Sequence, residues 1–137
     1  MGKLYMGFDA GTQSVKVAVY DENFELVAAE SLPTTLTYPQ PGWVQMDVDN
    51  YLDCCVKCMA KLSPRLKELG RDPSEVVSIM GDGVICGICG IDAEVRPVTP
   101  YINYLDSRTT EDVEALNARG LEIFGRETGN PEASPMF

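Results

Sequence analysis

The segment between residues 9 and 16 places a carboxylate, a glycine and short polar side chains between two stretches of strand-forming residues. Gly11 allows the backbone to approach a ligand closely, and the backbone donors of such a turn can bind a phosphate. Asp9 ends the first stretch, so its carboxylate could lie beside the magnesium ion that accompanies a phosphate. The candidate cofactor-binding residues are Asp9, Gly11, Thr12, Gln13, Ser14 and Lys16, with Asp9 as the candidate metal ligand.

Other interpretations of this segment stay open. A turn of the form Asp-x-Gly-Thr between two strands is often an ordinary hairpin without a ligand. Lys16 alternates with strand residues, so it is equally well explained as a solvated lysine on the surface of a strand. The segment contains neither GxxxxGK[ST] nor GxGxxG, and therefore differs from the phosphate loops that open a helix.

Five cysteines raise the question of a metal site. Cys55-x-x-Cys58 and Cys86-x-x-Cys89 have a spacing loosely seen in zinc sites. However, Cys86 and Cys89 fall in a strand-like run, where residues three apart face opposite sides, and Cys55 lies on the apolar stripe of an expected helix. Packing as small hydrophobic side chains therefore explains these cysteines better than zinc does.

The composition is typical of a folded globular protein, with 45% hydrophobic and 23% charged residues. The 21 acidic and 11 basic residues give a net charge of −10, which disfavours binding to nucleic acid phosphates. No apolar run approaches the roughly 20 residues that span a bilayer, and the N-terminus lacks the patterns of a secretory signal and of N-myristoylation. We therefore expect a cytoplasmic protein that binds neither nucleic acid nor a membrane.

Three strands are expected at the N-terminus, over residues 4–9, 15–20 and 25–31. The candidate phosphate-binding turn joins the first two strands, and Asp21-Glu22-Asn23 forms the turn before the third. Because both connections are short, the three strands should form an antiparallel meander.

A proline-rich loop over residues 33–43 separates this meander from an expected helix. Apolar residues recur at helical spacing over residues 48–69, and Asp47 or Asp49 can cap the helix. Pro64 lacks a backbone donor, so we expect it to kink the helix or to restart it.

The second half of the chain combines further strands with one more helix. Gly81-Asp82-Gly83 should interrupt the first of these strands, and Thr109 and Thr110 can cap a helix that ends near Gly120. The tail over residues 125–137 contains two glycines and two prolines and no expected closing element. The three stretches of strand character are residues 76–80, 84–91 and 98–105. The order of elements predicts an α/β fold with a mixed sheet that opens with a three-stranded antiparallel meander.

Four stretches, in order and with natural spacing, resemble the FGGY family of carbohydrate kinases, a branch of the actin/hexokinase/Hsp70 ATPase superfamily. The stretch over residues 104–109, Tyr-Leu-Asp-Ser-Arg-Thr, is similar to the family's Trp-x-Asp-x-Arg-Thr pattern. Thr128-Gly129-Asn130-Pro131 resembles a later Thr-Gly turn of the family. Besides residues 104–109, the four stretches comprise Gly-Phe-Asp-Ala-Gly-Thr-Gln-Ser-Val-Lys over residues 7–16, Tyr-Pro-Gln-Pro-Gly-Trp-Val-Gln-Met-Asp over residues 38–47, and Asp92 followed by Pro97-Val98.

The resemblance implies that residues 1–137 are the N-terminal part of the first domain of such a kinase. That domain would have a ribonuclease H-like (actin-like ATPase) fold, incomplete here at its C-terminus, and ATP would be held with Mg²⁺ between it and a second, adenine-binding domain. Asp9 would then lie near the magnesium ion. Gly11, Thr12, Gln13 and Ser14 would lie near the transferred phosphate.

The resemblance also implies a sugar side, bordered by Asp82, Tyr104, Asp106 and Arg108. Tyr104 could pack on the carbon face of a sugar, while Asp106 and Arg108 could bind hydroxyls or form a salt bridge with each other. Two positions depart from the family. Tyr104 replaces the usual tryptophan, and Asp82 stands where these kinases carry a glutamine-containing segment and glycerol kinases carry Arg-Glu. Glycerol is therefore disfavoured as substrate, and a keto-sugar such as xylulose, or another sugar or polyol, is favoured.

The expected function is phosphoryl transfer from ATP to a sugar or polyol hydroxyl. The family's general base is an aspartate expected beyond Phe137, so no catalytic residue is assigned in this chain, and the isolated chain should be inactive. The alternative is a standalone sugar- or phosphate-binding or regulatory module with the same fold and no catalysis. Another ATPase of the superfamily is disfavoured, because residues 38–47 and 104–109 belong to the sugar side. An uncovered sheet edge in a half-domain should also cause self-association.

Overall fold

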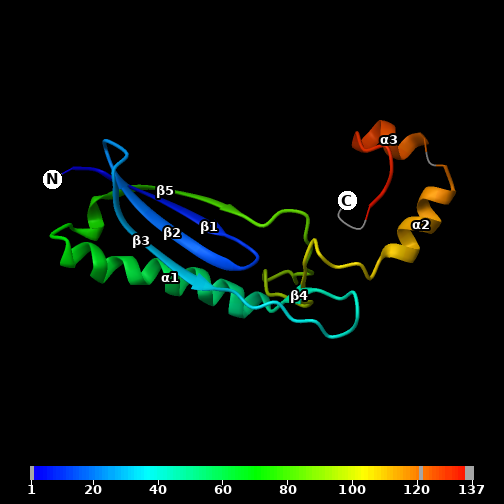
Figure 1. Ribbon diagram of the computed structural model, residues 1–137, viewed down its shortest axis with the longest axis horizontal. Helices are drawn as coiled ribbons and strands as arrows, with labels where there is room; N and C mark the ends of the chain where they lie inside the picture. Colours follow the sequence, from blue (N-terminus) through cyan, green and yellow to red (C-terminus); the bar gives the residue numbers. More distant parts are fainter. Residues whose placement is uncertain (1, 121, 135–137) are drawn as a thin grey trace. The chain divides into compact units, whose positions relative to one another are not determined.

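The computed structural model of the protein describes residues 2–120 and 122–134 (Figure 1). The chain divides into two compact units, each built from two separate stretches of sequence. The sheet unit comprises residues 1–36 and 47–84, and the loop unit comprises residues 37–46 and 85–137. No helix within the described ranges is long and apolar enough to span a membrane.

The sheet unit contains a four-stranded mixed sheet in the order β3-β2-β1-β5. Its strands are β1 (Leu4–Ala10), β2 (Ser14–Asp21), β3 (Leu26–Pro33) and β5 (Val76–Gly83). β2 pairs antiparallel with both β1 and β3, while β5 pairs parallel with β1. The expected antiparallel meander and the expected mixed sheet are therefore both confirmed.

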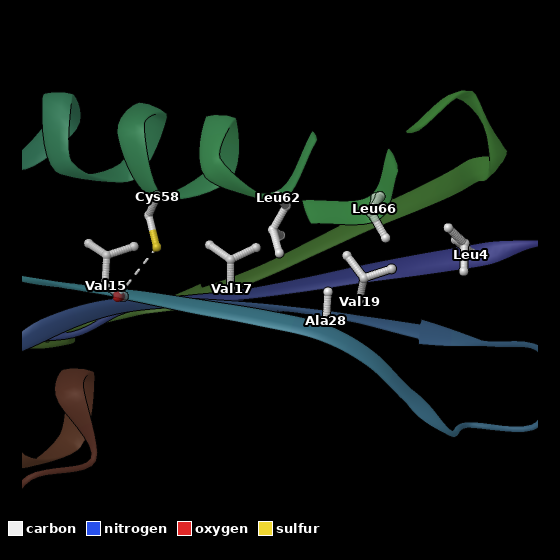
Figure 2. Close-up of a cluster of buried hydrophobic side chains, with 8 residues drawn as sticks. All are labelled: Leu4, Val15, Val17, Val19, Ala28, Cys58, Leu62 and Leu66. Atoms are coloured by element: carbon white, nitrogen blue, oxygen red, sulfur yellow. Dashed lines mark hydrogen bonds between the residues drawn. The ribbon is translucent and has the colours of Figure 1, made fainter. Parts of the chain in front are cut away.

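The alternation of side chains along β2 explains why one face of the sheet is covered. Val15, Val17 and Val19 are buried, whereas Lys16 and Tyr20, which alternate with them, are exposed. Successive side chains of a strand point to opposite faces, so the three valines form one apolar face. Helix α1 (Val48–Glu68) packs on that face through its buried residues Cys58, Leu62 and Leu66 (Figure 2).

Helix α1 begins where one of the two expected caps lies. The Asp47 side chain accepts a hydrogen bond of 2.7 Å from the Asn50 backbone N–H, which satisfies one of the free donors of the first turn. The helix continues through Pro64 to Glu68, so the expected restart at Pro64 is wrong. Pro64 lies in the last two turns, where the buried side chain of Leu66 still packs on the sheet. Tertiary packing thus outweighs the local cost of the proline.

The core of the sheet unit is a cluster of eight buried side chains between α1 and the sheet: Leu4, Val15, Val17, Val19, Ala28, Cys58, Leu62 and Leu66 (Figure 2). The Cys58 thiol donates a weak hydrogen bond to the Val15 carbonyl oxygen at 3.6 Å, and burial raises the pKa of this thiol. Cys58 therefore packs as a small hydrophobic side chain that stays protonated at neutral pH.

Strand β5 differs from its expected form at its C-terminal end. Gly81-Asp82-Gly83 does not interrupt the strand, because these residues pair in register with the last three residues of β1. Gly81 fits there for a steric reason, since the ring of Phe8 occupies the space where a side chain at Gly81 would project. The expected strand over residues 84–91 is wrong, and the chain turns away at Cys86, which has a φ of +59°.

The loop unit is held by a short antiparallel pair, β4 (Gln45–Met46) with β6 (Tyr101–Ile102). The expected strand over residues 98–105 is thus reduced to the two residues of β6. Ile102 of β6 also forms an isolated bridge with Ile88. Short pairing of this kind contributes little by itself, so side-chain contacts must hold the unit together.

Two helices follow in the loop unit, α2 (Thr110–Ala118) and α3 (Glu122–Thr128). Thr109 occupies the N-cap position of α2 without a side-chain capping bond, contrary to expectation. Thr110 instead donates its hydroxyl to the Ser107 carbonyl oxygen at 2.7 Å. α2 ends at Ala118, and Gly120 just beyond it has a φ of +58°, which suits a glycine. Helix α3 lies partly in the tail for which no element was expected.

Candidate functional site

The turn between β1 and β2 is fixed by hydrogen bonds to its carbonyl groups. The Gly11 N–H donates to the Ser14 carbonyl at 3.1 Å and closes the turn. Thr34 donates its hydroxyl to the Thr12 carbonyl at 2.6 Å and its N–H to the Gln13 carbonyl at 3.1 Å. The Tyr51 hydroxyl of α1 donates to the carbonyl of Ala10. The candidate phosphate-binding turn is therefore a preorganised structure, held from β3 and from α1.

A row of polar side chains crosses the sheet next to this turn, on the face opposite α1. Asp9 pairs with Lys16 of β2 and with Asp82 of β5, and Lys16 pairs with Ser31 of β3. Residues paired in register point to the same face, so we call Asp82, Asp9, Lys16 and Ser31 the polar row. The structure thus brings three predicted site residues together and adds Ser31, which the sequence analysis did not identify. Ser31 could have been found from the expected meander, because it lies on the third strand, next to Lys16, which in turn lies next to Asp9.

The charges of the polar row are unbalanced. Lys16 Nζ lies 3.6 Å from Asp9 Oδ2, and both side chains are more than half exposed. Asp82 Oδ1 accepts a hydrogen bond of 2.8 Å from the Gly83 N–H. Two carboxylates in register on adjacent strands repel each other, and one lysine offsets only part of this charge. Carboxylate oxygens in such a pair suit a hard divalent cation, so these residues fit a Mg²⁺ ion.

A cavity of about 940 Å³ lies over the polar row. Its floor includes Gly7, Ala18 and Ala29, three small residues that pair across β1, β2 and β3. Met80 of β5 borders the same floor. The volume falls in the range of small-molecule pockets, with an apolar floor and a few polar groups at one side. This face can therefore accept a small polar molecule or the side chains of a covering segment.

The second predicted group, Tyr104, Asp106 and Arg108, lies in the loop unit. Asp106 is 4% exposed, and both its carboxylate oxygens accept two hydrogen bonds each. Oδ1 accepts from the Arg108 N–H at 2.9 Å and from Arg108 Nε at 2.8 Å. Oδ2 accepts from the Val44 N–H at 2.6 Å and from Arg108 Nη2 at 2.7 Å. Of the two expected arrangements, the salt bridge between Asp106 and Arg108 is present.

Arg108 also contacts Trp43 of the proline-rich loop and Gln45 of β4. Its guanidinium carbon lies 3.9 Å from the ring centre of Trp43, which is a cation–π contact. Its Nη2 donates to Gln45 Oε1 at 3.2 Å. The sequence analysis gave Trp43 and Gln45 no role of their own. The signal was available, because both residues lie in the stretch over residues 38–47 that carries the family resemblance.

The pKa of the Asp106 carboxyl is lowered to about 2, and the hydrogen bonds from the Arg108 side chain are the main cause. A carboxyl group whose pKa in the folded protein lies below its usual value of 3.8 stabilises the fold at pH values above 3.8. We therefore predict that the loop unit loses stability as the pH falls from about 4 through about 2. Thermal unfolding followed by Trp43 fluorescence at pH 7, 4, 3 and 2 measures this effect. In Asp106→Asn the same pH series should be flatter, and identical slopes in the two proteins would contradict the prediction.

The sheet unit is an α/β unit whose first hairpin carries a hydrogen-bonded glycine turn, with the carboxylates of Asp9 and Asp82 beside it. The family model for the N-terminal domain of the FGGY family of carbohydrate kinases matches residues 4–136. The chain belongs to this family.

Individual relatives agree with this assignment. The chain is 30% identical over 118 residues to a xylulose kinase from Escherichia coli (strain K12), covering 85% of this chain and 23% of the relative. It is 33% identical over 122 residues to an uncharacterized sugar kinase from Archaeoglobus fulgidus, covering 88% of this chain and 23% of the relative. The chain thus spans about a quarter of the length of these curated relatives.

Among solved structures, a xyloylose kinase from Brucella ovis superposes with a TM-score of 0.86 at 28% sequence identity. The superposition covers 98% of this chain and 27% of that structure. The expected ribonuclease H-like, actin-like ATPase fold class is therefore confirmed. The roles assigned to individual site residues stay predictions.

Proposed function

We propose that this chain is the N-terminal part of the first domain of an ATP-dependent carbohydrate kinase, which transfers the γ-phosphoryl group of ATP to a hydroxyl of a sugar or polyol. The observation that carries the proposal is the family match over residues 4–136. A keto-sugar of the xylulose type is the favoured substrate, since a xylulose kinase is among the relatives at 30% identity. Glycerol kinases occur among the relatives at 28% and 29% identity, so glycerol belongs in the test.

In this proposal the polar row and the turn over residues 10–14 serve the phosphate end. Asp9, with Asp82 beside it in register, would hold Mg²⁺, and a bound Mg²⁺ neutralises charge on the transferred phosphoryl group. Gly11, Thr12, Gln13 and Ser14 would surround the phosphate with donors, while Lys16 orients Asp9 through their ion pair. The hydrogen bonds from Thr34 and Tyr51 keep this turn in place, so little ordering is needed when the phosphate binds.

Tyr104 would serve the sugar end. Its side chain is about one-third exposed, so the ring can still cover the carbon face of a sugar. A general base and the adenine site would come from the rest of a longer polypeptide. This agrees with the fact that the chain covers about a quarter of the length of its relatives. Phosphoryl transfer depends on positioning and charge stabilisation by both parts, so the 137 residues by themselves would not turn over ATP.

The first test is the intact mass of the native protein in its source cells, followed by an ADP-release assay with xylulose, other keto-sugars, polyols and glycerol. A mass several times 15.0 kDa, with release that depends on xylulose or a related keto-sugar, supports the proposal. Release with glycerol alone would overturn the substrate preference. A native mass of 15.0 kDa without ADP release would instead favour a standalone sugar- or phosphate-binding module.

Strand β5 carries a separate prediction, that the 137-residue chain self-associates. β5 lies at the edge of the sheet, and Val77, Ile79 and Met80 are each more than half exposed. The strand contains no lysine or proline, the residues that usually prevent edge-to-edge pairing. Sedimentation velocity over a hundredfold concentration range should show dimers or larger species, and Ile79→Lys should reduce them. A monomer throughout the range would contradict this prediction.

A further inference from the structure

The turn that presents Tyr104 is anchored at both corners by buried polar side chains. The Asp106 N–H donates to the Asn103 carbonyl at 2.9 Å, which closes a four-residue turn with Tyr104 and Leu105 at its tip. Asn103 and Asp106 are 2% and 4% exposed, whereas Tyr104 and Leu105 are 36% and 50% exposed. The corners of the turn are thus buried, while its tip is accessible.

Each corner is tied to Val44, the residue that follows the proline-rich loop. The Asn103 N–H donates to the Val44 carbonyl at 3.0 Å, and the Val44 N–H donates to Asp106 Oδ2. This one residue therefore contacts both corners. Ser107 adds a third tie, because its N–H donates to the Gly42 carbonyl at 2.8 Å. Gly42 has a φ of +79°, and a side chain there would meet the Ser107 hydroxyl, so this approach requires glycine.

We propose that Asp106, Arg108 and Trp43 form a clamp that orients Tyr104, so that Asp106 and Arg108 are positioning residues and not sugar ligands. The proposal rests on the proposed function in one respect, that the molecule at Tyr104 is a sugar. It goes beyond that function because it assigns specificity for sugar binding to a cluster of residues that do not touch the sugar.

The hydrogen-bond inventory of Asp106 supports this assignment. A carboxylate has about four acceptor positions, and four donors from Val44 and Arg108 already use them. A sugar hydroxyl could donate to Asp106 only by displacing one of these donors. The displaced donor, an N–H of Val44 or Arg108, would lose its buried acceptor, and an unsatisfied buried donor costs free energy.

The geometry of Arg108 supports it as well. One face of the guanidinium lies on Trp43, and the edge with Nε and Nη2 forms a two-point bond with Asp106. The side chain is 18% exposed, whereas Arg71 is 24% exposed and the ion-paired Arg65, Arg96 and Arg126 are 53–73% exposed. A planar, two-point pair with an aromatic support restricts rotation, which lysine cannot reproduce.

The consequence is lower ordering cost when a ligand binds at Tyr104. Without the clamp, the turn would sample several conformations and would lose this freedom on binding, which weakens affinity without altering the reacting groups. Loss of the clamp should therefore raise the KM for the sugar and leave kcat nearly unchanged.

A double-mutant cycle in the complete kinase tests the proposal, with Asp106→Asn, Tyr104→Ala and the pair combined. We expect Asp106→Asn to raise the KM for the sugar about 10-fold, with kcat within about threefold of the unmodified protein. In the Tyr104→Ala background, Asp106→Asn should change KM less than about twofold, because its effect passes through Tyr104. If the KM increases of the two single variants instead multiply in the double variant, Asp106 contacts the sugar itself and the proposal is overturned.

Controls separate the clamp from the rest of the protein. Asp112→Asn makes the same chemical change on the exposed surface of α2 and should leave KM unaltered. Arg108→Lys keeps the charge but removes the two-point bond, and should raise KM in the same Tyr104-dependent way if Asp106→Asn fails to fold.

A readout that needs no sugar separates this proposal from the proposed function. Trp43 is the single tryptophan, so acrylamide quenching of its fluorescence in the 137-residue chain reports on the clamp. Quenching should increase in Asp106→Asn and Arg108→Lys and stay unaltered in Asp112→Asn. If no sugar is phosphorylated, the proposed function fails, and increased quenching still supports the clamp. Quenching equal to that of the unmodified chain in both clamp variants would overturn it.

Discussion

Replacement of Asp9 by Asn is expected to lower the kcat of the proposed kinase by about 100-fold or more. Asn keeps the size of the side chain but removes the charge that would hold Mg²⁺ beside the transferred phosphate. Asp82 lies in register with Asp9 and is a second carboxylate for the same ion. Asp82 alone supplies one negative charge where the pair supplied two, so the ion would be held less tightly.

ADP release at saturating sugar, measured across a range of Mg²⁺ concentrations, checks this prediction. The variant should need more Mg²⁺ for half-maximal rate and should stay slow at saturation. Asp53→Asn is the matched control, because Asp53 is also an exposed carboxylate paired with a lysine, Lys57, and it lies away from the polar row. An Asp9→Asn protein as fast as this control would remove Asp9 from the metal site.

Leu62→Ala should lower the free energy of unfolding of the sheet unit by about 2–5 kcal/mol. Leu62 is 1% exposed and lies at the centre of the cluster between α1 and the sheet (Figure 2). Removing its terminal carbons loses apolar burial and leaves a cavity, because Val17 and Leu66 belong to rigid elements that cannot fully close it.

Urea unfolding followed by far-UV circular dichroism measures this loss of stability. Leu52→Ala is the control, since Leu52 belongs to the same helix but is 54% exposed, and it should cost less than about 1 kcal/mol. Equal unfolding midpoints for the two variants would contradict the assignment of Leu62 to the core.

Local patterns predicted the elements that their own residues specify. The three opening strands are short runs rich in strand-forming residues, and short turns between them favour an antiparallel meander. Helix α1 was predictable from its apolar spacing, which places Cys58, Leu62 and Leu66 on one face.

Features that depend on distant partners were not predictable in this way. The local sequence around Gly81 and Gly83 predicts an interruption of the strand. However, β1, about 70 positions earlier in the chain, supplies backbone partners for both residues. The apolar residues after Val84 have strand character, but no neighbouring strand receives them beyond two isolated bridges in the described part of the chain. Pro64 is tolerated because α1 packs on the sheet on both sides of it.

The candidate site shows the same division. The hairpin with Asp9 and Gly11 is local, and its position was correct. The neighbourhood of Asp9 and Asp82 depends on the parallel pairing of β1 with β5, which no local pattern specifies. The contact of Arg108 with Trp43 joins loops 65 residues apart, so from sequence the salt bridge with Asp106 was one of two possibilities.

The interleaving of the two units limits how the loop unit can pass intact between related genes. The chain crosses from one unit to the other after residues 36, 46 and 84, so the loop unit consists of two separate coding stretches. A single recombination event within residues 47–84 would join the Trp43 loop of one parent to the Tyr104 turn of another. Such a hybrid keeps the proposed clamp only if both parents carry matching residues at Trp43, Asp106 and Arg108. Exchange of the loop unit with the sheet unit kept therefore requires two separate replacements, and chimeras cut once within residues 47–84 should be selected against.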